Sequence, residues 1–122
     1  MTTTQTLNQF LTNIKTAQLI SFEQTMQIID EHYQFTPTMF ENGLGAEMII
    51  NQPGTNPGSC KIFAFARLHE LNEPQTLGLF GDYYHKDVLS NPMATGHANI
   101  RNFMKYGWKG INMPDNPLQL LD

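Results

Sequence analysis

Residues 56–66, Asn-Pro-Gly-Ser-Cys-Lys-Ile-Phe-Ala-Phe-Ala, join a cluster of turn-forming residues to one of the longest apolar stretches of the chain. The apolar positions at its end continue with helical spacing through Ile62, Phe65, Ala66 and His69. This period predicts a buried helix that starts near Ser59, with Phe63 widening its apolar stripe. A strand over residues 60–66 is the alternative, because short apolar runs fit both structures.

The preceding residues 51–58, Asn-Gln-Pro-Gly-Thr-Asn-Pro-Gly, are predicted to form the main loop, because Pro and Gly interrupt helices and strands. Before this loop, the pattern predicts three helices. Their signals are an apolar stripe from Leu7 to Ile14, a capping box at Ser21 and Gln24, and a Thr36-Pro37 start for a short helix through Phe40.

After the central helix, the sequence predicts two more. One starts at Asn72 and Pro74 and continues to about Val88, with Asp82 and Lys86 able to pair on its outer side. The other surrounds Ile100 and ends at Gly107, where glycine permits a left-handed cap against which Trp108 folds back.

The tail from Gly110 contains two prolines and is predicted to run extended over the core, pinned by Ile111, Met113 and Leu118. A chain of 122 residues is too short for two ordinary cores. We therefore expect one domain over residues 1–122. Its predicted fold class is all-α or nearly so, with five or six short helices, one Pro/Gly-rich loop and an irregular C-terminal tail.

Composition narrows the functional classes. The formal net charge is −4 and there is no basic run, which disfavours binding to nucleic acid or to an anionic membrane. No apolar stretch approaches the length of a membrane-spanning helix. The first thirteen residues are mainly Thr, Gln and Asn and do not resemble a cleavable signal peptide, while a single cysteine suits a reducing compartment. These features predict a cytoplasmic protein.

Four ordered blocks carry a resemblance to a known family. They are Ile29-Asp-Glu-His-Tyr-Gln-Phe-Thr-Pro, Asn56-Pro-Gly-Ser-Cys-Lys-Ile-Phe-Ala-Phe-Ala, Thr76-Leu-Gly-Leu-Phe-Gly-Asp-Tyr-Tyr and His97-Ala-Asn-Ile-Arg-Asn-Phe-Met-Lys-Tyr-Gly-Trp. Together they make the chain similar to the HopJ type III effector family. The resemblance implies delivery through a type III secretion system for at least some members, but it carries no assigned reaction and no catalytic residue.

The first site hypothesis concerns the start of the central helix, at Asn56, Ser59 and Lys61. Backbone N–H groups at a helix start can bind an anion. The spacing departs from a phosphate loop, because Gly58 is followed by Ser-Cys-Lys rather than Lys and then Ser or Thr. A simple turn and helix cap explains the same residues.

The second site hypothesis concerns the polar side of the last helix, where His97 and Arg101 lie at i and i+4, with Asn99 and Asn102 nearby. These side chains can bind a carboxylate or the backbone of a partner. Alternatively, they tie the helix to the neighbouring loop and tail.

Cys60 lies beside the helix start that could activate it, yet a lone cysteine is more often a buried and inert thiol. The four histidines occur singly, without the i, i+4 pairing of many metal sites, so we predict no metal and no cofactor. The leading functional hypothesis is binding to an unidentified protein or small-molecule partner. The alternative is a small enzyme or ligand-binding protein that uses Ser59–Lys61 together with His97 and Arg101.

Overall fold

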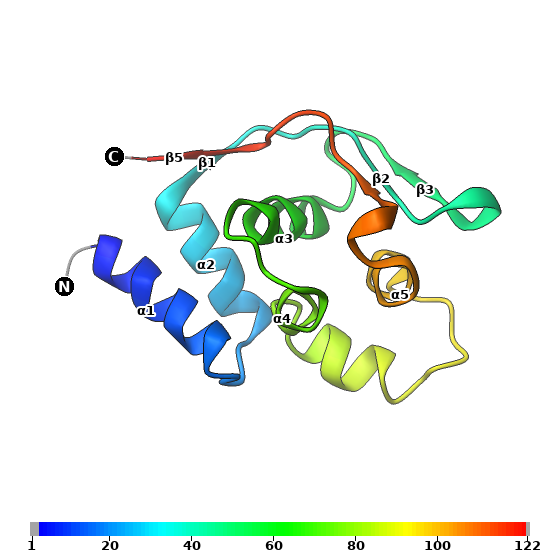
Figure 1. The fold of residues 1–122 in the computed structure, drawn as a ribbon, viewed down its shortest axis with the longest axis horizontal. Coiled ribbons are helices and arrows are strands. Elements are labelled where there is room, and N and C mark those ends of the chain that lie inside the picture. Colours follow the sequence, from blue (N-terminus) through cyan, green and yellow to red (C-terminus); the bar gives the residue numbers. More distant parts are fainter. Residues whose placement is uncertain (1–2, 122) are drawn as a thin grey trace.

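The fold is built around one central helix, α3 (Pro57–Leu68). In the computed structural model, the backbone is described for residues 3–121 and the side chains for residues 7–121. Figure 1 shows α3 in the middle, with the other helices beside and below it and the strands along one edge. The helices around it are α1 (Thr3–Lys15), α2 (Phe22–His32), α4 (Glu73–Gly78) and α5 (Ala98–Tyr106), with shorter helical segments η1 (Gly45–Glu47), η2 (Tyr83–Val88) and η3 (Gly107–Gly110).

The predicted helix starts at Ser21 and Asn72 and the predicted helix end at Gly107 are confirmed. The single helix predicted from Asn72 to about Val88 is wrong, because Gly81, with a φ of 61°, separates α4 from η2. Ser21 and Asn72 each form a capping box, in which the cap side chain accepts the third backbone N–H of the helix and a glutamine side chain accepts the cap's own N–H. Gly107 has a φ of 63° and ends α5. Lys86 and Asp82 form the i, i+4 pair, with 3.6 Å between Nζ and Oδ2.

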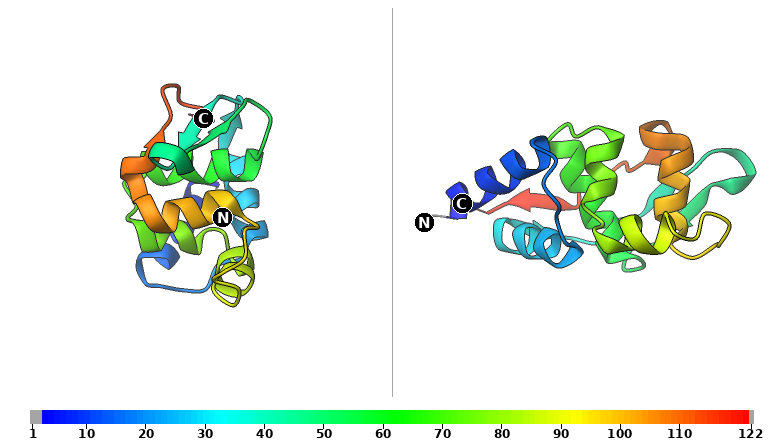
Figure 2. Two further views of the ribbon diagram at one scale, coloured as in Figure 1. Left: turned by 90° about the vertical axis from the view of Figure 1, so that its right-hand side faces the viewer. Right: turned by 90° about the horizontal axis from the view of Figure 1, so that it is seen from below.

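The expectation of an all-α domain is wrong, because the described chain also contains five short strands in two antiparallel sheets. One sheet pairs β1 (Tyr33–Phe35) with β5 (Leu118–Leu120), and the other has the order β3 (Ile49–Asn51), β2 (Phe40–Asn42), β4 (Ile111–Asn112). The two further views in Figure 2 show these strands packed beside the helices. The sheets join parts of the chain that are far apart, since Tyr33 lies opposite Leu120 and Glu41 opposite Asn112.

The predicted short helix from Thr36 to Phe40 is also wrong. The backbone N–H of Thr36 donates to the carbonyl of Pro117 at 2.8 Å, so this segment runs alongside the tail instead of closing a helical turn. The tail is not irregular throughout, because β4 and β5 belong to it. Its expected burial is confirmed at Met113, 5% exposed, and Leu118, 1% exposed.

Phe63 is the centre of the core. It is fully buried on α3, and its ring packs against those of Phe40 at 5.8 Å, Phe80 at 5.7 Å, Phe103 at 5.0 Å and Trp108 at 6.4 Å. These rings come from a strand, the segment after α4, α5 and η3, so one side chain ties four parts of the chain together. The alternative of a strand over residues 60–66 is excluded, because these residues belong to α3.

Within the described residues, no helix could cross a membrane.

Candidate functional site

Two helices begin beside the same pocket. The pocket has a volume of about 440 Å³ and lies between the starts of α3 and α5, and we call it the α3/α5 pocket. It is lined by Phe22, Ile49, Asn56, Gly58, Ser59, Phe80, Tyr83, His97, Ala98, Asn99 and Ile100. Four of the seven predicted site residues, Asn56, Ser59, His97 and Asn99, therefore meet at one place although they come from two distant segments.

The two helix starts share an unusual backbone geometry. Asn56 precedes α3 with a φ of 48°, and His97 precedes α5 with a φ of 57°, both in the left-handed region that non-glycine residues seldom adopt. Among the described side chains, none caps either helix. The first N–H groups of both helices thus keep their hydrogen-bonding capacity, and the two helix dipoles place partial positive charge at the pocket.

His97 contributes an imidazole that is held on two sides. Its Nε2 lies 3.2 Å from Oδ2 of Asp87, and its ring centre lies 5.2 Å from that of Tyr83. Tyr83 in turn packs edge to face on Phe22 with 5.0 Å between ring centres. The rings of His97, Tyr83 and Phe22 therefore border the pocket in a row. The carboxylate of Asp87 can orient the imidazole of His97, the ring at one end of this row.

Buried asparagines support the pocket from behind. The side-chain oxygen of Asn51 accepts from the amide nitrogens of Asn56 at 2.8 Å and Asn99 at 2.9 Å. Asn42 and Asn51 donate to Oδ1 of Asn99 at 3.0 and 3.2 Å. The sequence did not predict a role for Asn42 or Asn51, because Asn42 follows the predicted short helix through Phe40 and Asn51 begins the predicted main loop.

The other three predicted site residues point elsewhere. Lys61 forms an ion pair with Asp30 at 2.8 Å. Arg101 donates to the carbonyls of Gly96 and Asn91 and so holds the loop before α5. Asn102 donates to the carbonyls of Asn42 at 3.0 Å and Glu47 at 2.8 Å, which ties α5 to the neighbouring β2 and η1.

Cys60 faces the core instead of the pocket. It is 2% exposed, as predicted, and its Sγ lies 3.8 Å from the carbonyl oxygen of Thr38. Burial raises the pKa of the thiol, which keeps it protonated near neutral pH. Within the described part of the chain, no three His, Cys, Asp or Glu side chains gather as a metal site would require.

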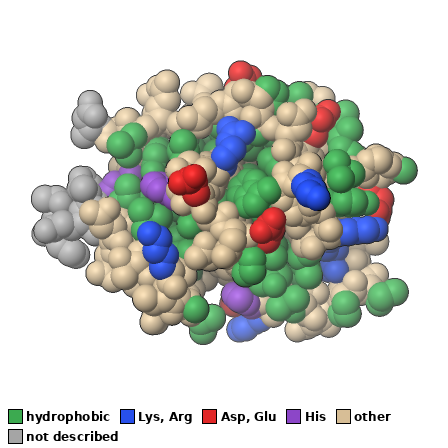
Figure 3. Space-filling view, viewed as in Figure 1, with side chains coloured by type: hydrophobic (Ala, Val, Ile, Leu, Met, Phe, Trp, Pro, Cys, Tyr) green, Lys and Arg blue, Asp and Glu red, His purple; other side chains and the backbone are tan. Residues whose placement is uncertain are grey.

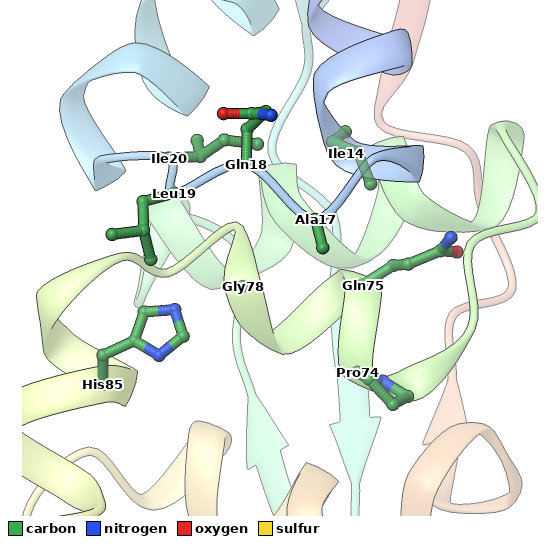
Figure 4. Close-up of a pocket in the computed structure, with 9 residues that line it drawn as sticks. All are labelled: Ile14, Ala17, Gln18, Leu19, Ile20, Pro74, Gln75, Gly78 and His85. Carbon is green, nitrogen blue, oxygen red and sulfur yellow. The ribbon is translucent and has the colours of Figure 1, made fainter.

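A second pocket, of about 200 Å³, lies between the end of α1 and α4. Figure 4 shows its lining side chains, which come from Ile14 to Ile20 on one side and from α4 and His85 on the other. Among these nine residues, only His85 has an ionisable side chain, so this pocket offers fewer reactive groups than the α3/α5 pocket. The face seen in Figure 3 has acidic and basic side chains scattered singly, without a large patch of one sign.

Comparisons with known proteins agree with this structure. The chain is 43% identical to a solved structure titled "Crystal structure of unknown function protein VPA0580", with a TM-score of 0.88, covering 93% of this chain and 92% of that one. No curated protein matches the chain. Residues 7–118 match the family described as HopJ type III effector protein. Since that match spans nearly all of the chain, the protein belongs to the HopJ type III effector protein family.

Proposed function

We propose that this HopJ family protein acts by binding, and that its α3/α5 pocket takes a small organic anion with a flat apolar part. The observation that carries the proposal is the convergence of two uncapped helix starts on one pocket of about 440 Å³. That volume falls within the range of small-molecule sites. The pocket ligand is a specific case of the binding function expected from the sequence, which also includes a protein partner bound at the surface.

The chemistry of the lining supports each half of this ligand. Backbone N–H groups at Gly58, Ser59, Ala98 and Asn99 belong to the first turns of the two helices and suit a carboxylate or phosphate. The Ser59 hydroxyl and the His97 ring add further donors. The rings of Phe22, Phe80 and Tyr83 provide apolar surface for a flat group.

The test uses phenyl phosphate and benzoate as probes, followed by titration calorimetry and by ¹H–¹⁵N NMR. Inorganic phosphate and benzyl alcohol separate the contribution of the anion from that of the ring. We expect both probes to bind more tightly than either fragment, with the largest shifts at the amides of Ser59 and Asn99. Equal shifts spread over the surface, or no binding of any probe, would overturn the proposal.

A hydrolase is a second candidate, because Ser59 lines the pocket together with His97, which pairs with Asp87. In this arrangement Asp87 would orient the imidazole as a general base for the Ser59 hydroxyl. No hydrogen bond joins Ser59 to His97 among the described contacts, and binding is therefore the preferred function. Hydrolysis of p-nitrophenyl acetate that disappears in both S59A and H97A would favour the enzyme.

The family description also suggests delivery through a type III system. The first acidic residue of the chain is Glu23, and an acid-poor N-terminal segment of this kind is similar to the leaders of type III substrates. In the folded protein, however, Leu7, Phe10 and Ile14 of α1 lie in the core. Delivery would therefore require α1 to leave the core.

The delivery test fuses residues 1–25 to a reporter in a bacterium with a type III apparatus and in a strain that lacks it. Export from the first strain alone would support delivery. Retention in both strains would assign the segment to a purely structural role as the first helix of the domain.

A further inference from the structure

We infer that Asn51 is a positioning residue: it sets the separation between the starts of α3 and α5, and through it the affinity of the pocket between them. The inference rests on the proposed binding function. Asn51 does not line the pocket, and it is only 1% exposed at the end of β3. Any effect on a ligand must therefore pass through its neighbours.

Those neighbours are one residue from each helix start. A single oxygen, Oδ1 of Asn51, accepts from Nδ2 of Asn56 at 2.8 Å and from Nδ2 of Asn99 at 2.9 Å. Its own Nδ2 donates back to Oδ1 of Asn99 at 3.2 Å. One side chain thus joins the residue before α3 to the first turn of α5, and both of those residues line the pocket.

The bond to Asn56 also offsets backbone strain. With a φ of 48°, Asn56 occupies the left-handed region, which favours glycine and which asparagine adopts more readily than most other residues. The hydrogen bond from its side-chain amide to Oδ1 of Asn51 is the side-chain contact that stabilises Asn56 in this conformation. Because α3 begins immediately afterwards, the direction of its first N–H groups depends on this contact.

Asn102 provides a matched control. Like Asn51, it is an asparagine whose side chain joins α5 to the strand side: from α5 it donates to the carbonyls of Asn42 and Glu47. Among the described residues, it forms no hydrogen bond to the start of α3. Removing either side chain costs hydrogen bonds to the backbone or to other asparagines, although one of the two bonds of Asn102 is exposed. Only the removal of Asn51 disconnects the two helix starts.

The experiment compares N51A with N102A in two readouts. The first, which needs no ligand, is the ¹H–¹⁵N NMR spectrum: N51A should shift the amides of both Ser59 and Ala98, whereas N102A should leave Ser59 unchanged. The second is the affinity for phenyl phosphate, which N51A should weaken by about tenfold and N102A by less than about twofold.

A further variant, N56G, guards against loss of folding in N51A. This change removes the side-chain hydrogen bond to Asn51. It should keep the backbone conformation, because glycine adopts a positive φ without strain. In the ligand-free spectrum, its effect on the amide of Ser59 should not add to that of N51A, because both variants remove the hydrogen bond between Asn51 and Asn56. Additive effects would contradict the inference.

The inference is also overturned if Ser59 does not move in N51A, or if N51A and N102A weaken binding equally. Failure of phenyl phosphate to bind the wild type would count against the proposed function instead. In that case, the ligand-free spectra still decide whether Asn51 connects the two helix starts.

Discussion

The phenolic oxygen of Tyr33 lies 2.6 Å from Nε2 of His69, across the junction between β1 and the end of α3. Burial lowers the pKa of His69, with a smaller contribution from the charge of Lys15, and burial raises the pKa of Tyr33. Both shifts favour neutral groups. The hydroxyl of Tyr33 therefore donates to the unprotonated Nε2 of a neutral imidazole.

This pair predicts that stability falls in mild acid. The folded-state pKa of His69 lies below its unfolded value of about 6.5, so the unfolded chain takes up the proton first as the pH drops. The stabilisation is complete above the unfolded pKa and is lost as the pH falls toward the folded one. Urea unfolding of the wild type at about pH 7.5 and about pH 5.5 should show this loss.

The variant H69Q should reduce that pH dependence, because the glutamine side chain does not titrate. The matched control is H85Q, which changes an exposed histidine and should leave the wild-type difference intact. An unchanged difference in H69Q would show that other groups cause the acid sensitivity.

Cys60 should react slowly with a thiol reagent in the native protein. The side chain is 2% exposed and burial raises its pKa, so both access and the fraction of thiolate are low. Labelling with DTNB followed by absorbance should become fast only when denaturant is added. Rapid native labelling near neutral pH would contradict the assigned burial.

Two glycines of adjoining segments should respond in opposite ways to alanine. Gly81 has a φ of 61°, and a Cβ there would lie 2.5 Å from the backbone nitrogen of Phe22, so G81A should destabilise by about 2 kcal/mol or more. A Cβ on Gly78, the last residue of α4, would meet nothing within 4 Å. G78A should therefore stabilise by up to about 1 kcal/mol. Thermal and urea unfolding of both variants check the sign.

Arg101 and His97 should separate into a scaffold and a pocket residue. R101A removes the bonds that hold the loop carbonyls of Asn91 and Gly96, and we expect a loss of stability of about 1–2 kcal/mol. H97A removes a half-exposed pair with Asp87 and should cost less than about 1 kcal/mol. Urea unfolding gives the stabilities and phenyl phosphate titration the affinities. Weaker binding in R101A than in H97A would reverse the assignment.

Much of the helical part of the fold was predictable because its signals are local. The capping boxes at Ser21 and Asn72 place donor and acceptor three residues apart, and the apolar stripe of α3 repeats within a dozen residues. The strands were not predictable in the same way. Each has two or three residues, which is too short for a visible alternation, and Tyr33 finds its partner at Leu120.

The candidate site divides along the same line. The sequence alone determined that polar residues follow a helix start at Asn56 and occupy one side of the helix that contains His97. Only the tertiary structure decided that Asn56, Ser59, His97 and Asn99 share a pocket while Lys61 and Arg101 do not. The physical reason is that a helix signal acts over a few residues, whereas the meeting of two helix starts depends on contacts such as Asn51 with Asn99, 48 positions apart.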